Sequence, residues 1–275
     1  MVTTWHLINI KARTNQTPTH YIKALKDLKE KDPLIEVSKD RCISIMDISS
    51  SSENTKGVPS WLIIKLMAYT IIDPKNFYNR KKQENVEMTW DSDVVANKKE
   101  SEIIFVPSNH TIAVRKSSKI SYHQILKYFR EGLNEIENDG FDVNIVISKD
   151  LLNRIRTAHS IIKINAEISF SNPSHTKLFV KEWDEKVREA NPDSMRIELD
   201  GTKSSPLKYE EDGLIFAITE MAERDGTINA IIQEDKDGKY ERVNSAEHPR
   251  ILSVELTSRK NFWGDMFNAI RNLFN

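Results

Sequence analysis

The strict alternation of apolar and polar residues from Ile162 to Phe170 constrains the fold more than any other feature. Its apolar members are Ile162, Ile164, Ala166, Ile168 and Phe170, and a polar residue stands between each of them and the next. A period of two residues is that of a β-strand with one dry face and one wet face. A strand buried on both faces of a parallel sheet would instead be an unbroken apolar run. The same alternation recurs at 195–200 and 252–256, so we expect a sheet face that is open to solvent or to a partner.

Amphipathic helices are expected to cover the other face of these sheets. The clearest helix begins at Tyr122, and its apolar residues recur every three or four positions as far as Ile136. Further helices are predicted at 18–31, after Ser148, at 173–190 and at 214–225, and strands at 5–10, 34–38, 42–48, 61–72, 102–106, 111–115, 141–147, 228–232 and 239–243. The last two strands would pair across a two-residue turn at Asp237-Gly238. The fold class is therefore α+β, with mixed or antiparallel sheets covered on one face by amphipathic helices, in two α/β subdomains.

The charge of the chain is divided unevenly between its two halves. The 275 residues carry a formal net charge of only −1. Residues 1–130 contain 21 Lys or Arg and 14 Asp or Glu, a charge of +7, whereas the remainder contains 19 and 27, a charge of −8. We expect a basic N-terminal subdomain at 1–140 and an acidic C-terminal subdomain at 141–275, which ends in an amphipathic helix. A basic face suits a polyanion, although ordinary solubility also explains such a split.

Residues that build the common cofactor sites are scarce or scattered. Cys42 is the only cysteine, so no intramolecular disulfide can form, and a reducing, cytoplasmic setting is expected. No histidine has a second ligand at a spacing typical of zinc or iron sites, and the eight glycines do not cluster into a phosphate-binding loop. No apolar run is long enough to span a bilayer, and no signal peptide is evident. We therefore expect no cofactor, no metal and no membrane partner, and we favour a protein that is not an enzyme.

Clusters of basic residues in the N-terminal half are the strongest indication of function. They comprise Lys11, Arg13, Arg80, Lys81, Lys82, Lys98, Lys99, Arg115 and Lys116. Cations of this kind neutralise phosphates and gain from counterion release, and aromatic neighbours such as Tyr78 and Trp90 can stack on exposed bases. The segment 73–100, which holds five of these residues, shows no periodicity and is expected to be a long loop that orders on contact with a partner. The leading hypothesis is non-specific nucleic-acid binding, and a set of solvated loop tips is the plain alternative.

Two other classes of function stay open at this point. Asp91 and Asp93 form a carboxylate pair of the kind that holds magnesium in nucleases, although such pairs are common in polar loops. A protein-interaction module, such as an antitoxin or an effector partner, would instead dock through the wet sheet face around Lys163, Asn165 and Glu167. Such a module would bind no nucleic acid.

The C-terminal helix carries an unusually bulky apolar stripe. Its members include Phe262, Trp263, Met266, Phe267 and Ile270. Aromatic side chains are enriched at subunit interfaces, so this stripe is a candidate homodimer interface. Docking of the helix on the core of its own chain explains the same pattern.

Several short stretches resemble a bacterial and phage family described as domain of unknown function 4747. The matching residues are 5–10 (Trp-His-Leu-Ile-Asn-Ile), 19–28, 105–110 (Phe-Val-Pro-Ser-Asn-His), 168–173 and 247–249 (Glu-His-Pro). The size and layout are also similar to those of the RexA type of phage exclusion protein, a DNA-binding dimer. These resemblances imply a role in conflict between bacteria and phages, with a second copy or a second defence protein as partner. They supply no catalytic residues.

Overall fold

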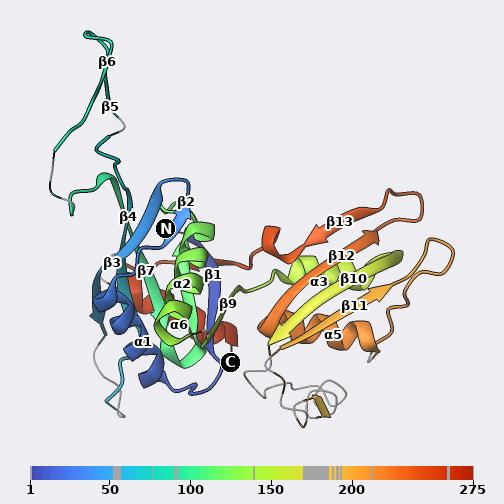
Figure 1. Ribbon diagram of the computed structural model, residues 1–275. Coiled ribbons are helices and arrows are strands. Elements are labelled where there is room, and N and C mark those ends of the chain that lie inside the picture. Colours follow the sequence, from blue (N-terminus) through green and yellow to red (C-terminus); the bar gives the residue numbers. More distant parts are fainter. Residues whose placement is uncertain are drawn as a thin grey trace.

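The computed structural model contains two large sheets, and all of the strand pairs described are antiparallel. It describes residues 2–51, 57–75, 77–89, 91, 93–138, 140–169, 186–187, 189, 192, 194–211, 213–258 and 261–274. Each sheet has helices packed on it, and Figure 1 shows the two resulting lobes side by side. The predicted α+β class, with antiparallel sheets covered by helices, is confirmed.

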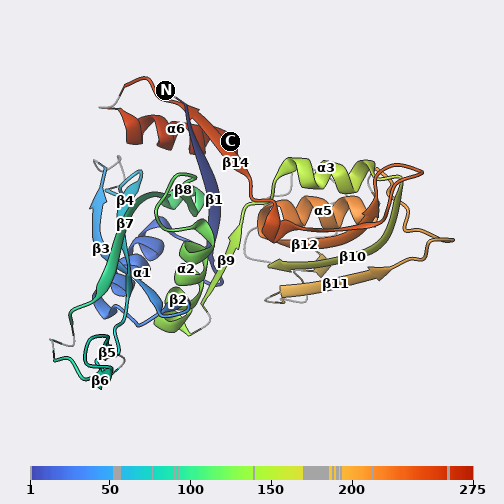
Figure 2. The ribbon, with the colours of Figure 1, turned by 90° about the horizontal axis from the view of Figure 1, so that it is seen from above.

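The first lobe is built around the sheet with strand order β14-β1-β8-β7-β4-β3-β2, in which β9 also pairs with β1. Its strands are β1 (Val2–Ala12), β2 (Glu36–Ser38), β3 (Arg41–Ser50), β4 (Leu62–Thr70), β7 (Ala96–Val106), β8 (Thr111–Arg115), β9 (Phe141–Ile145) and β14 (Ile251–Glu255). The helices α1 (Pro18–Lys31) and α2 (Tyr122–Glu137) cover one face, and α6 (Phe262–Phe274) covers the other, as Figure 2 shows. The hairpin of β7 and β8 turns through the 3-10 helix Pro107–Asn109 and confirms the predicted pairing.

Local signals in the sequence set the ends of these helices. Thr17 caps α1 by accepting the backbone N–H of His20, and a proline follows at the first helical position, where a missing N–H costs nothing. Ser121 and Gln124 form a reciprocal capping box at the start of α2. Asn138 ends α2 in the left-handed conformation with φ 43°, which Asn tolerates better than most residues.

The second lobe contains the strand of alternating apolar and polar residues predicted at 162–170. Its sheet has the order β11-β10-β12-β13, formed by β10 (Ser160–Ser169), β11 (Ser194–Asp200), β12 (Gly226–Gln233) and β13 (Glu241–Asn244). The helices α3 (Lys149–Thr157) and α5 (Leu214–Asp225) cover one face. Ile164, Ala166 and Ile168 are buried beneath these helices, and Lys163, Asn165 and Glu167 lie on the opposite face, which no described helix covers. The predicted dry and wet faces are therefore confirmed from Lys163 to Ile168, whereas Ser169, predicted on the wet face, is buried.

Two details of this sheet differ from the sequence prediction. A β-bulge between Ile161 and Lys163 inserts an extra residue, so Ile161 rather than Ile162 enters the core. Ile232 pairs with Glu241, so the connection to β13 is longer than the predicted two-residue turn. Phe170 and nearly all of the helix predicted at 173–190, including Phe179 and Trp183, lie outside the described residues.

The chain crosses between the lobes twice, through a two-stranded neck formed by residues 146–148 and 248–250. The N–H of Ser148 donates to the carbonyl of His248 at 2.9 Å, and that of Arg250 donates to the carbonyl of Val146 at 2.7 Å. Consequently β9, β14 and α6 belong to the first lobe, whereas the sequence analysis assigned 141–275 to one acidic subdomain.

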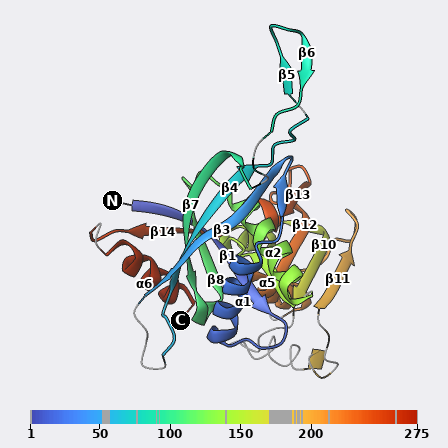
Figure 3. The same ribbon diagram turned by 60° about the vertical axis from the view of Figure 1, so that its left-hand side comes forward.

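A two-stranded arm extends from the first lobe between β4 and β7. It consists of β5 (Phe77–Asn79) and β6 (Glu84–Val86), which pair with each other in a separate sheet. Figures 1 and 3 show the arm projecting beyond the end of the large sheet. The segment expected to be a loop thus contains a short hairpin, and β7 begins earlier than predicted. A lone hairpin of this size is only marginally stable in water, so contact with a partner would stabilise it.

The apolar stripe of α6 packs on its own chain. Met266 and Ile270 are fully buried, and Phe262, Trp263 and Phe267 pack around them against β1, β7 and β14. The ring of Trp5 lies 5.7 Å from that of Phe262 and 6.2 Å from that of Trp263. Met266 and Ile270 are therefore unavailable to a second copy while the helix is docked. No helix among the described residues is long and apolar enough to cross a membrane.

Truncating Ile270, one of the two fully buried residues of α6, tests whether the apolar stripe stabilises the first lobe. Ile270→Ala should lower the free energy of unfolding by about 3 kcal/mol, because it opens a cavity under the helix. Asn268→Ala, at an exposed position of the same helix, should leave it nearly unchanged. Urea unfolding followed by circular dichroism measures both. If Ile270→Ala instead weakens self-association at unchanged stability, the helix is an interface rather than a cover.

Candidate nucleic-acid interface

Strand register brings seven of the nine predicted cations to one end of the first sheet. Thr70, at the end of β4, pairs with Ala96 at the start of β7, and the arm connects these two ends. Ile103 of β7 pairs with Val114 of β8, so β8 ends beside residue 102, six residues along β7 from Ala96, and the chain leaves it toward this end. We call this region the basic end, and it carries Arg80, Lys81, Lys82, Lys98, Lys99, Arg115 and Lys116.

The turn of the arm presents three consecutive cations to solvent. The side-chain oxygen of Asn79 accepts the backbone N–H groups of Lys81 and Lys82, both at 3.1 Å, and so fixes the turn. Arg80, Lys81 and Lys82 are all exposed. Lys82 lies 3.8 Å from Glu84, and in the described part of the chain Arg80 and Lys81 have no carboxylate within ion-pair distance. The turn is thus a fixed, positively charged tip.

Apolar side chains are exposed along the same arm and its two connections. Tyr78 is 60% exposed and stands beside the charged turn. Ile71, Met88 and Val94 are also among the large exposed apolar residues. An exposed aromatic ring next to cations is the arrangement that binds single-stranded nucleic acid by stacking. The predicted contribution of Trp90 lies outside the described residues.

At the foot of the arm, one carboxylate pairs with two lysines. Glu100 lies 2.7 Å from the Nζ of Lys98 and 2.9 Å from that of Lys65. The hydrogen bonds from Lys98 and Lys65 lower the pKa of Glu100 to about 2. Glu100, Lys98 and Lys65 together therefore keep one net positive charge, whereas Lys99 is exposed and has no ion pair within the described residues.

A second positive charge, that of Lys116, lies just after β8 beside a group of stacked rings. Lys116 donates its backbone N–H to Thr4, which places it next to β1 and His6. The His6 ring stacks on Tyr122 with the centroids 4.5 Å apart, and the rings of Tyr122 and His123 lie 3.9 Å apart. Burial lowers the pKa of His6, and the charges of Lys116 and His123 lower it further.

Sequence reasoning missed this ring group. It treated the histidines as scattered and Tyr122 as part of an apolar stripe. The ring of Tyr122 is instead half-buried, and its hydroxyl donates to the carbonyl of Ala246 at 3.3 Å. The pairing of β1 with β8, which brings His6 beside Lys116, has no local signal in the sequence.

Lys11 and Arg13 lie at the opposite end of β1 and are not part of the basic end. Lys11 is only 6% exposed, so it cannot reach a phosphate at the surface. Arg13 forms an ion pair with Asp142 at 3.0 Å. The nine residues therefore do not form one surface.

The carboxylates of Asp91 and Asp93 do not converge on a metal site. The carboxylate of Asp91 accepts the backbone N–H of Asp93 at 3.0 Å, so it stabilises a turn at the foot of the arm. No group of three or more His, Cys, Asp or Glu residues close enough to hold a metal exists among the residues that the structure describes. The arrangement offers no geometric support for a two-metal or one-metal nuclease.

The uncovered face of the second sheet is crossed by ion pairs. Lys163 contacts Glu198 and lies 3.1 Å from Asp200, and Glu167 lies 3.3 Å from Arg196. The charges of this face are therefore largely compensated within β10 and β11. Its suitability for docking another protein stays a prediction.

One family matches nearly the whole chain. The sequence model of the family described as Domain of unknown function (DUF4747) matches residues 1–273. No curated protein matches the chain.

His110, at the end of the sheet that holds Lys11, should make folding sensitive to acid. Burial, with a contribution from Lys11, lowers its pKa to about 4, whereas the unfolded chain titrates near 6.5. The unfolded state therefore binds the proton more tightly, so stability is full above about pH 6.5 and declines as the pH falls toward 4.

The substitution His110→Asn removes the titration and suits the left-handed backbone at this residue, where φ is 53°. Between pH 7 and pH 5 the parent should lose stability on the order of 1 kcal/mol more than the variant, as measured by urea unfolding at each pH. Equal losses in both proteins would show that His110 is not the titrating group.

Proposed function

Since the chain belongs to the DUF4747 family, whose description specifies no activity, we propose from the structure that it binds nucleic acid without sequence specificity through the basic end of its first lobe. The tip of the β5–β6 arm would make the first contact, and Lys99, Arg115 and Lys116 would add contacts to phosphates. The role in phage defence implied by the family resemblance is part of this proposal.

The observation that carries the proposal is the geometry of the arm. A two-stranded ribbon fits the major groove of duplex DNA, and exposed cations on its turn can reach phosphates. Asn79 holds the turn in place before binding, which reduces the entropy lost when the contact forms. The arm has little support from the rest of the lobe, so a partner would order it further.

The chemistry of the basic end favours contacts with the backbone of the nucleic acid over reading of bases. Its charged side chains are mostly lysines, which act as point charges toward phosphate. Base reading commonly uses bidentate arginine or amide side chains in a groove, and the turn of the arm offers only Arg80 and Gln83 for that purpose. Affinity should therefore depend strongly on salt and weakly on sequence.

Removing the charges of the turn should weaken binding and flatten its salt dependence. The triple variant R80A/K81A/K82A should lose affinity for DNA or RNA by about tenfold or more. The slope of log K against log salt should fall by about 3, one for each lost phosphate contact. Fluorescence anisotropy with labelled duplex and single-stranded oligonucleotides over a salt series measures both quantities.

A matched control removes three exposed lysines of the second lobe, Lys208, Lys236 and Lys239. K208A/K236A/K239A causes the same change in net charge and should leave affinity and slope nearly unchanged. Equal effects of the two triple variants would show that only total charge matters. Absence of binding by the parent at low salt would end the proposal and favour the protein-interaction alternative.

Tyr78 distinguishes single-stranded from duplex binding. If bases stack on its exposed ring, Tyr78→Ala should weaken binding of single strands by about tenfold, whereas Tyr78→Phe retains the ring and should bind as the parent does. Duplex binding should change little in either variant, because paired bases are not available for stacking. The same anisotropy assay applies, and identical behaviour of the two variants would exclude stacking at this position.

A further inference from the structure

A polar cleft lies between the two lobes, far from the arm. It has a volume of about 330 Å³ and is open on one side. Its lining comprises Arg13, Arg130, Asn134, Phe141, Asp142, Val143 and Asn144 from the first lobe, and Glu167, Ser169, Ser194 and Thr227 from the second. Ligand pockets begin at about this size. The two walls belong to different lobes, so a ligand here would contact both.

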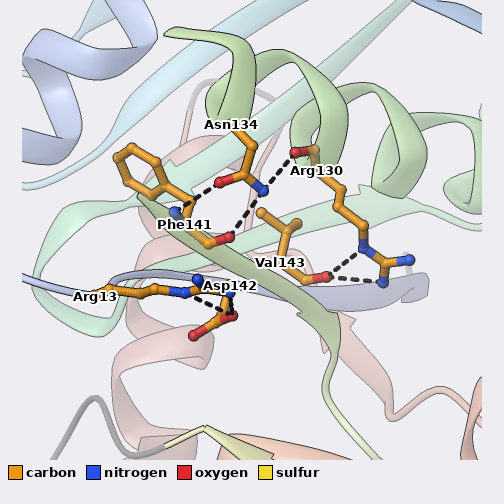
Figure 4. A network of polar contacts seen from close by, with 6 residues as sticks. All are labelled: Arg13, Arg130, Asn134, Phe141, Asp142 and Val143. Atoms are coloured by element: carbon orange, nitrogen blue, oxygen red, sulfur yellow. Dashed lines mark hydrogen bonds and ion pairs between the residues drawn. The ribbon is translucent and has the colours of Figure 1, made fainter. Parts of the chain in front are cut away.

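The wall of the first lobe is held rigid by hydrogen bonds between α2 and β9. The amide of Asn134 donates to the carbonyl of Phe141 at 2.9 Å and accepts its N–H at 2.8 Å, as Figure 4 shows. Arg130 donates from Nε and Nη2 to the carbonyl of Val143 at 3.0 and 2.9 Å. These bonds fix one edge of the guanidinium, and no carboxylate forms an ion pair with Arg130 among the described residues.

Asp142 presents an unused acceptor beside this wall. Arg13 donates from Nε and Nη2 to Oδ1 of Asp142, at 3.3 and 3.0 Å. The other oxygen, Oδ2, is buried and has no hydrogen-bond partner. An ionised oxygen without a donor is costly to bury, so a turn of the carboxylate toward a donor supplied by a ligand would be strongly favoured.

The wall of the second lobe supplies hydroxyl groups. Ser169 and Ser194 are directly opposite each other on β10 and β11, and Thr227 follows Gly226 at the start of β12. A Cβ on Gly226 would lie 2.1 Å from the carbonyl oxygen of Glu167, so only glycine lets β12 approach β10 this closely. This approach brings the three hydroxyls to the same end of the sheet.

The charges of the described cleft residues leave one cation in excess. Asp142 is neutralised by Arg13, and Glu167 lies 3.3 Å from Arg196. Arg130 therefore remains the uncompensated charge that faces an incoming molecule. Its planar guanidinium favours a phosphate or carboxylate group, whereas the hydroxyls, Asn144 and Asp142 Oδ2 favour a molecule that carries several hydroxyl donors.

From this arrangement, we propose that the cleft binds a small sugar phosphate, either a nucleoside monophosphate or a free phosphorylated sugar. The phosphate would pair with Arg130, and a sugar hydroxyl would donate to Asp142 Oδ2 once the carboxylate turns toward the cleft. Serine and threonine hydroxyls of the second lobe would bind the remaining sugar oxygens. Because the chain crosses between the lobes at the narrow neck, such a ligand would also hold them together.

Isothermal titration calorimetry of the full chain tests the proposal. The probes are the four common nucleoside monophosphates, ribose 5-phosphate, adenosine and inorganic phosphate. Binding of the monophosphates alone assigns a nucleotide, and binding of ribose 5-phosphate with comparable affinity assigns a sugar phosphate. Adenosine and inorganic phosphate should each bind at least about tenfold more weakly, because each lacks half of the contacts. Absence of binding by all phosphorylated probes at millimolar concentration overturns the proposal, and so does equal binding of inorganic phosphate.

Two cleft variants and their matched controls separate this site from general charge effects. Asp142→Asn keeps the size of the side chain and should weaken binding about tenfold, whereas Asp237→Asn in an exposed loop should not. Arg130→Gln should have a similar effect, and Arg242→Gln on β13 should have none. Unchanged urea unfolding of Asp142→Asn excludes a folding defect. Normal ligand binding by both cleft variants overturns the proposal.

The same variants keep this proposal independent of nucleic-acid binding. R80A/K81A/K82A should bind the sugar phosphate normally, and Asp142→Asn should bind oligonucleotides normally. Loss of ligand binding in the arm variant would overturn the assignment to the cleft, whatever the outcome of the oligonucleotide assay.

Discussion

Hydrogen bonding along β1 is the interaction on which the rest of the structure depends. This strand pairs with β8 on one side, and on the other side with β14 over its first half and β9 over its second half. Both crossings to the second lobe occur next to it, because β9 leads into the neck and β14 follows it. Its alternate side chains also divide between two cores, with Ile8 and Ile10 beneath α1 and α2, and Trp5 and Leu7 beneath α6. Helices cover both faces of β1, and for this reason few of its residues are exposed.

The neck gives the molecule two lobes whose relative position depends on few groups. Each sheet has its own apolar core, and the surfaces that face each other across the cleft are polar. A cleft lined by fixed arginine and asparagine side chains on one wall and by hydroxyls on the other is therefore a consequence of how the chain crosses. Ligand binding between lobes commonly acts on such hinge connections.

Register, more than composition, decides the electrostatics of the surface. The basic N-terminal half includes Lys11, which is buried, and Arg13 and Lys98, which are paired with carboxylates. Antiparallel pairing of β4, β7 and β8 nonetheless brings the arm, Lys99 and Lys116 to one end of the sheet. A count of charges along the sequence detects neither the pairing of Arg13 with Asp142 nor the gathering of cations at the end of the sheet, because both join residues that lie far apart in the chain.

The sequence by itself determined the local elements: the alternating strand at 163–169, the stripe and capping box of α2, the N-cap of α1 and the hairpin of β7 and β8. Each depends on side chains within a few positions of one another, so local pattern suffices. Only the tertiary structure decided that β9, β14 and α6 return to the first lobe, and that Ile161 replaces Ile162 in the core. It also placed His6 beside Lys116, and Arg130 across from Ser194. Those arrangements arise from pairing between distant strands, and the free energy of that pairing depends on contacts that no short window of sequence contains.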